Sequence, residues 1–330
     1  SSFANSSLVS ANFDNTEYYM GSGYFKGATL TDASFVSADF NDYANFEGAS
    51  AKRADFSFAD LGAGESGQAK FASADLDGAN FSGADLESAD FSNASLIGAD
   101  LSNLSSDSTD YMSIDFSFAQ MMSADLSGSK FTFGTNFSSA DLSDAKLESS
   151  GFYTSMSNLV ADGADFSGSW FEMSSFANSS LVSANFDNTE YYMGSGYFKG
   201  ATLTDASFAS ADFYGYANFE GASAERADFS SADFGGGDEY DQVKFSFADL
   251  DGANFSGADL QNADFSNASL IGANLSNLSS DTYSYMSIDF SNAQMMSADL
   301  SGSKFNSDTN FSSADLSDAK LVNSAIMTSM

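Results

Sequence analysis

The sequence predicts an all-β solenoid in which the chain turns four corners per coil. An apolar residue returns at every fifth position from Phe71 to Leu101, within words of the form A-(D/N)-(L/F)-S-x. A period of five matches neither the 3.6 residues of a helical turn nor the two-residue alternation of a strand. The chain also contains no Pro, which would remove a ladder donor from every coil that it entered.

Each five-residue word is expected to form one side of a coil. The large residue and the Ala two places before it should point inward, whereas the Asp or Asn between them should face solvent. Four words then make a coil of about 20 residues, and coils stack at about 4.8 Å, the spacing of paired strands. Longer intervals, such as the one from Phe152 to Phe166, are expected to be loops or bulges on a regular stack.

Dozens of words fit this register, for example Ala84-Asp85-Leu86 and Ala89-Asp90-Phe91. On these residues the chain resembles the pentapeptide-repeat proteins along essentially its whole length. The resemblance implies a right-handed quadrilateral β-helix, which at this length has about 16 coils. It implies much less about function, because some family members resemble rods of duplex DNA and block type II topoisomerases, and most have no assigned activity.

A second, longer repeat divides the chain into two blocks, residues 1–173 and 174–330. The segment from Ser1 to Phe35 is identical to the segment from Ser174 to Phe208, and the second block is incomplete. We expect the two blocks to continue as one solenoid without a capping helix, as a piece of a longer array. An uncapped coil exposes unpaired backbone groups, so this expectation favours end-to-end pairing with another block or another copy.

Composition excludes several classes of function. The chain has 11 Lys and Arg residues against 46 Asp and Glu residues, a net charge of -35, and it contains no His and no Cys. Those absences remove Ser-His-Asp and Cys-His catalysis and nearly all zinc sites, so we expect no enzyme, no resident metal and no cofactor. The charge disfavours direct nucleic-acid binding, and no apolar stretch is long enough to span a membrane. Loosely bound cations on the acidic columns remain an expectation.

Differences between the blocks mark candidate contact residues. Three phenylalanines at outward positions of the first block are replaced by polar residues at the aligned positions of the second block. At one position the phenylalanine is in the second block instead. The pairs are Phe58 with Ser231, Phe118 with Asn292, Phe133 with Ser307, and Phe247 with Ser73. Trp170 is also expected to point outward. We predict lateral contacts through these residues, with Phe58 and Phe118 on the same face.

One loop carries clustered carboxylates at Asp238, Glu239 and Asp241 beside three glycines. Such a loop can hold Ca²⁺, which takes six to eight oxygen ligands, but its counterpart in the first block has a single acid. A solvated loop is therefore the preferred interpretation, and no metal site is predicted.

Two functions fit these features. The first is a structural protein: an acidic rod that forms part of an extracellular or cell-surface filament through end-to-end and lateral self-assembly. The alternative is a cytoplasmic DNA-mimicking module that acts on a DNA-binding enzyme such as a type II topoisomerase. Polymers are expected for the first function, and competition with DNA for the second.

Overall fold

The computed structural model describes residues 2–18, 23–40, 43–62, 68–104, 113–132, 134–192, 196–214, 216–235, 242–278 and 286–327. The chain falls into two compact units, Ser1–Asp165 and Phe166–Met330, and each is described by itself. The predicted continuity of the two sequence blocks stays a prediction.

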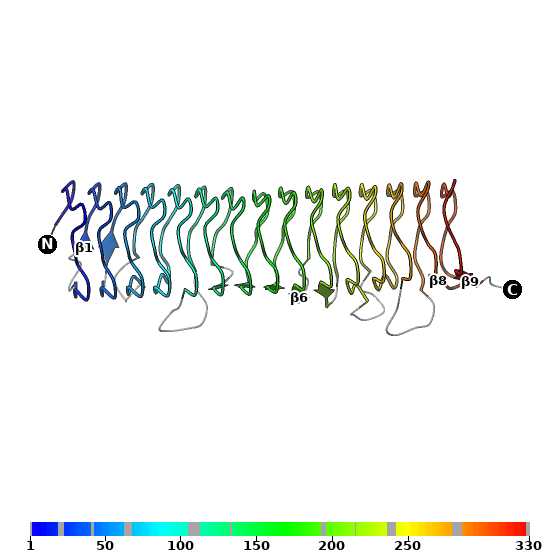
Figure 1. Ribbon diagram of the computed structural model, residues 1–330, viewed down its shortest axis with the longest axis horizontal. Helices are drawn as coiled ribbons and strands as arrows, with labels where there is room; N and C mark the ends of the chain where they lie inside the picture. Colours follow the sequence, from blue (N-terminus) through cyan, green and yellow to red (C-terminus); the bar gives the residue numbers. More distant parts are fainter. Residues whose placement is uncertain are drawn as a thin grey trace. The chain divides into compact units, whose positions relative to one another are not determined.

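Each unit is a parallel β-solenoid with four ladders of backbone pairing, one on each side of the turn (Figure 1). We name the ladders A to D in chain order. Their first rungs in the first unit are Ser2–Tyr24 (A), Ser7–Thr29 (B), Asn12–Ser34 (C) and Glu17–Asp39 (D). The corresponding rungs in the second unit are Ser175–Tyr197, Ser180–Thr202, Asn185–Ser207 and Glu190–Asp212. The predicted four-sided all-β fold is therefore confirmed.

The turns are longer than four ideal words. Successive rungs of ladder A at Tyr24, Asn45 and Lys70 lie 21 and 25 residues apart. Because insertions lengthen many turns beyond 20 residues, the described part of ladder B has eight positions in the first unit and seven in the second, slightly fewer than the 16 coils expected, and the described residues contain no helix. No described segment forms a helix of the length and apolarity needed to cross a membrane.

Only short stretches of the ladders qualify as strands, and all of their described pairings are parallel. In ladder A, β1 (Gly23–Tyr24) pairs with β2 (Ala44–Asn45). In ladder D of the first unit, β3 (Lys130–Phe131) pairs with β4 (Gly151–Phe152). In ladder D of the second unit, β6 (Glu190–Tyr192) lies between β5 (Trp170–Glu172) and β7 (Asp212–Phe213), and β8 (Lys304–Phe305) pairs with β9 (Ala325–Ile326).

Hydrogen bonds explain why one word makes one side. The Leu76 amide donates to the Ser95 carbonyl of the next turn at 2.7 Å, and the Ala79 amide donates back to the Leu76 carbonyl at 2.9 Å. The second bond closes a tight turn at the corner. Gly78 occupies the third position of that turn with φ of 65°, a conformation that suits Gly and Asn and strains bulky residues.

The Asp or Asn of many words caps its own corner. Asp55 Oδ1 accepts a hydrogen bond from the Ser57 amide at 2.9 Å, and Asn80 Oδ1 accepts one from the Ser82 amide at 2.9 Å. Carboxylate and amide oxygens thus perform the same local task, as is common for Asx turns. The cap needs an oxygen acceptor and does not need a charge, and words with Lys70 or Val160 at this position pair without a cap.

The core is an aromatic stack. Phe71 of ladder A stacks on Phe91 of the next turn at 4.7 Å between ring centroids, while it meets Phe81 of ladder C edge-on at 5.5 Å and 90°. All three side chains are fully buried. Offset or parallel stacking along each column and edge-to-face contact between columns are both favourable ring geometries.

The expected register fails after Leu61 and again after Leu101. Asp60 belongs to ladder D, and Lys70, ten residues later, belongs to the next ladder, A. Asp100 belongs to ladder C, and Asp115 belongs to ladder A, where it pairs with Asp90. Phe116 accordingly stacks on Phe91 at 5.4 Å. One side thus takes ten residues from Asp60 to Lys70, and two sides take fifteen from Asp100 to Asp115, so the regular count of one five-residue word per side is wrong for both intervals. The interval from Phe152 to Phe166, expected to be a loop or bulge, instead continues the regular words, with Val160 on ladder B and Asp165 on ladder C.

Candidate interaction face

The structure separates the phenylalanines that the sequence analysis grouped together. Phe58, Phe118 and Phe247 have exposed fractions of 67%, 60% and 66%, as outward positions require. However, Phe58 follows ladder C, whereas Phe118 follows ladder A, so the prediction that they share one face is wrong. Its cause is the pair of register changes after Leu61 and after Leu101, each of which delays the later words by one side. Phe133 lies outside the described residues.

Each of these phenylalanines occupies the strained corner position. Phe58, Phe118 and Phe247 have φ values of 55°, 57° and 60°, where glycine or asparagine is more easily accommodated. The Phe58 ring lies flat against the corner of the next turn, because a Cβ added at Gly83 would be 2.7 Å from a ring carbon. They are single apolar projections, and the described residues do not join Phe58 and Phe118 into one stripe.

Ladder D carries a feature that the sequence analysis missed, an uninterrupted run of carboxylates. We call this run the acidic ladder of each unit. In the first unit it consists of Glu17, Asp39, Asp60 and Asp85. In the second unit it consists of Glu190, Asp212, Asp233 and Asp259. Along the described rungs of ladders A, B and C within either unit, no more than two acidic residues follow one another.

The acidic ladder is electrostatically costly. Asp212 is half-buried between Glu190 and Asp233. Its burial raises the pKa of the carboxyl above its ordinary value, and repulsion from Asp233 and Glu190 raises the pKa further, against a hydrogen bond from Tyr214. The last carboxylate of the acidic ladder is buried, since Asp259 is only 7% exposed. The open part of this surface is therefore the stretch from Glu190 to Asp233.

Aromatic side chains accompany the acidic ladder of the second unit. The Tyr192 hydroxyl donates a hydrogen bond to the Glu190 carboxylate, which raises the pKa of Tyr192 to about 12. Tyr192 stacks on Tyr214 at 4.9 Å between ring centroids, and Tyr214 is 48% exposed. Trp170, predicted to point outward, is half-buried in β5 and pairs with Glu190 across β5 and β6.

This arrangement offers carboxylates and aromatic rings to a cationic group. Among the described residues, no group of three or more acidic side chains is arranged to hold a metal ion, and the chain has no His or Cys to act as base or nucleophile. Asp238, Glu239 and Asp241 lie outside the described residues. Carboxylates interleaved with tyrosines match the chemistry of lysine and arginine, through ion pairs and cation–π contacts.

The repeats of this chain are similar to those of known proteins. The family model of pentapeptide repeats matches residues 68–103 and 241–277, with eight copies. No curated protein matches the chain by sequence. Among solved structures, the chain is similar to HetL, a pentapeptide repeat protein involved in heterocyst differentiation regulation from the cyanobacterium Nostoc sp. strain PCC 7120, at 25% identity over 85% of this chain and 86% of that one, with a TM-score of 0.19.

Two further structures are similar. QnrB1, a plasmid-mediated fluoroquinolone resistance protein, is 18% identical over 63% of this chain and 93% of its own, with a TM-score of 0.23. A pentapeptide repeat protein from the Arabidopsis thaliana thylakoid lumen is 26% identical over 43% of this chain and 68% of its own, with a TM-score of 0.18.

Proposed function

This chain is a pentapeptide-repeat protein, and on that premise we propose that it is a non-enzymatic binding scaffold. Its acidic ladder engages the cationic, DNA-binding surface of a partner protein, of the kind found on a type II topoisomerase. Ladder D of each unit is the contact face, and the paired turns of that unit hold its carboxylates in register.

The composition of ladder D supports the proposal. The corner cap needs only an oxygen acceptor, and Asn80 serves as well as Asp55. On ladders A, B and C the acids are interleaved with Asn, Ser, Gln and Lys, which relieves repulsion between turns. Four acids in succession on ladder D of both units bring a repulsive cost that folding does not require. A cost that folding does not explain is expected where a surface serves binding.

The row of charge and the neighbouring side chains fit the same partner. Carboxylates repeat along the ladder at about 4.8 Å, so the ladder presents a continuous row of negative charge, although its spacing is wider than the rise of about 3.4 Å between phosphates along one DNA strand. Tyr192 and Tyr214 add ring faces beside Glu190 and Asp212. Tyrosine is enriched in the energetically dominant parts of protein interfaces, where it contacts arginine and lysine well.

Competition with DNA tests this function. The probe is DNA supercoiling by a type II topoisomerase, measured with increasing amounts of the full chain. The ladder variant carries Glu190→Gln, Asp212→Asn and Asp233→Asn. A charge-matched control removes one acid from each of the other ladders, with Asp228→Asn, Asp264→Asn and Asp315→Asn. We expect inhibition by the native chain and the control and its loss in the ladder variant. Absence of inhibition, or equal effects of the two variants, would overturn the proposal.

Self-assembly is the second candidate, and the exposed phenylalanines favour it. Phe58, Phe118 and Phe247 each remain more than half exposed at corners where a bulky residue is strained. Such residues gain nothing from the solenoid core, so a contact with another copy would give them a role. They do not form one continuous stripe, and assembly through them would involve more than one face.

Sedimentation velocity over a range of protein concentrations tests self-assembly. The variant exchanges each phenylalanine for the residue at the same position of the other block, Phe58→Ser, Phe118→Asn and Phe247→Ser. Assembly predicts large species for the native chain and smaller species for the variant at equal concentration. A native chain that sediments as a monomer at every concentration would exclude this candidate and leave the binding scaffold.

A further inference from the structure

One pair of carboxylates at ladder B has an ion-pair partner in the first unit and has none among the described residues of the second. In the first unit Lys52 Nζ lies 3.0 Å from Asp75 Oδ2 and 2.9 Å from Asp77 Oδ2. The ammonium group thus sits between two carboxylates of the next turn. Asp77 is held in place by its other oxygen, which accepts hydrogen bonds from the Ser95 hydroxyl at 2.5 Å and the Ile97 amide at 3.3 Å.

The second unit keeps the carboxylates and loses the cation. Asp249 and Asp251 stand at the positions of Asp75 and Asp77, and Glu225 replaces Lys52. Asp251 is fixed in the same way, because its Oδ1 accepts hydrogen bonds from Ser269 at 2.5 Å and Ile271 at 2.9 Å. Within the described part of the chain, no Lys or Arg forms an ion pair with Asp249 or Asp251.

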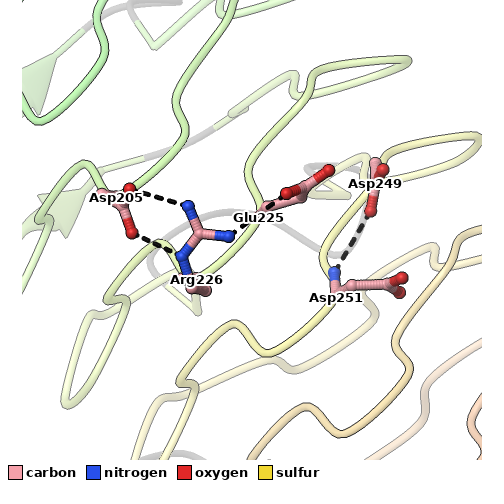
Figure 2. A network of polar contacts seen from close by, with 5 residues as sticks. All are labelled: Asp205, Glu225, Arg226, Asp249 and Asp251. Atoms are coloured by element: carbon pink, nitrogen blue, oxygen red, sulfur yellow. Dashed lines mark hydrogen bonds and ion pairs between the residues drawn. The ribbon is translucent and has the colours of Figure 1, made fainter.

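The neighbouring Arg226 already has other ion-pair partners. Arg226 forms a two-pronged ion pair with Asp205, with nitrogen–oxygen distances of 2.7 Å and 2.8 Å, and a third contact to Glu225 at 3.3 Å (Figure 2). In the same view, Asp249 and Asp251 lie apart from the guanidinium, and the Asp251 backbone amide donates a hydrogen bond of 3.3 Å to Asp249 Oδ1. Both carboxylates are only half-buried, so a group from outside can approach them.

We propose that Asp249 and Asp251, beside Glu225, form a docking point for a lysine ammonium group of a partner protein. The first unit shows that this pair of carboxylates accepts an ammonium, since Lys52 occupies the equivalent place with ordinary ion-pair distances. Glu225 removes the internal competitor and adds a third negative charge. The site lies on ladder B, so it is separate from the acidic ladder and its test is independent of the proposed function.

Lysine fits the site better than arginine. The internal precedent is one compact nitrogen that contacts two oxygens from different residues, which is the geometry of a point charge with rotatable donors. A guanidinium instead prefers both oxygens of one carboxylate, as Arg226 and Asp205 demonstrate beside the site. The expected partner therefore presents an exposed lysine on a protruding segment.

Carbodiimide cross-linking to a trilysine peptide tests the site, because the reagent joins an amine to a carboxylate only when the two are in contact. Mass spectrometry then locates the linked carboxylates on the full chain. In the native chain we expect the peptide on Asp249 or Asp251 and an internal link from Lys52 to Asp75 or Asp77. Glu225→Lys should replace the peptide link with an internal one, and Lys52→Glu should create a new peptide link at Asp75 or Asp77.

Glu148→Lys is the matched control, since it makes the same change of charge at a different ladder. It should leave the link at Asp249 or Asp251 intact. Equal labelling of the two carboxylate pairs in the native chain would overturn the proposal, as would a peptide link that survives Glu225→Lys. Links at Asp212 or Asp233 report on the acidic ladder instead and have no bearing on this site. Circular dichroism verifies that each variant is folded.

Discussion

Neutralising the middle of the acidic ladder should stabilise the protein. Asp212 stands between Glu190 and Asp233 on neighbouring rungs. Two unit charges at about 4.8 Å repel by about 0.9 kcal/mol in water and by several times more near a low-dielectric wall. Two such neighbours, discounted for the half-exposed position of Asp212, give about 1 kcal/mol of relief in Asp212→Asn at low salt. The amide of the variant retains an acceptor oxygen for the hydrogen bond from the Tyr214 side chain.

The assay is thermal unfolding followed by circular dichroism. A gain of about 1 kcal/mol corresponds to a rise in Tm of about 2–4 °C for a unit of this size. The gain should shrink between about 20 mM and about 500 mM NaCl, since the Debye length falls from roughly 20 Å to roughly 4 Å. Because the pKa of Asp212 is raised, the advantage of the variant should also shrink as the pH falls and Asp212 of the native chain takes up a proton.

Asp228→Asn provides the control. Asp228 occupies the same position of its word on ladder C, between Ser207 and Asn254, and it accepts a hydrogen bond from Asn254 at 3.0 Å. It has no carboxylate on either neighbouring rung, so its neutralisation should give no comparable gain. The reasoning is refuted if Asp212→Asn lowers the Tm at low salt, or if both variants raise it equally.

Three further perturbations probe the core and the surface. Tyr18→Phe removes a hydroxyl that is buried without a hydrogen-bond partner among the described residues, and it should raise the free energy of unfolding by about 1–3 kcal/mol in urea titrations; a loss of stability would show that the hydroxyl is satisfied. Burial raises the pKa of Tyr18 to about 12, so folding favours its neutral form. The free energy of unfolding of the native chain should therefore fall more steeply than that of the variant as the pH rises from about 10 towards 12. Parallel pH profiles would contradict this. Phe81→Ala opens the aromatic stack between Phe56 and Phe91 and should cost about 3–5 kcal/mol, and a cost below about 1 kcal/mol would contradict close packing. Arg226→Gln removes an exposed ion pair, so its small effect on Tm should vanish at high salt, and a large effect that persists in salt would mean that the pair is structural.

The sequence predicted the local architecture because a single short word controls it. The return of a large residue at every fifth position placed Phe71, Leu76 and Phe81 in the core, and all three are fully buried. The absence of Pro agreed with uninterrupted pairing. These inferences needed only the chemistry of one word, repeated.

Relations between turns were harder to predict, because they depend on how each insertion changes the register. Counting words across the intervals after Leu61 and Leu101 placed Phe118 on the face of Phe58, whereas Asp115 and Phe116 belong to ladder A. The same uncertainty hid the acidic ladder. Glu190, Asp212 and Asp233 are 22 and 21 residues apart, so they align only when the lengths of the intervening turns are known.

The most direct measurement of the central claim compares the affinities of two equally charged variants for one cationic probe. A decalysine peptide is titrated into the native chain, the ladder variant and the charge-matched control, and heat is recorded by calorimetry at moderate salt. If the acidic ladder is the binding face, the dissociation constant should rise sharply in the ladder variant and change little in the control. If the peptide responds only to the net charge of -35, the two variants should weaken binding equally, and this result would contradict the account.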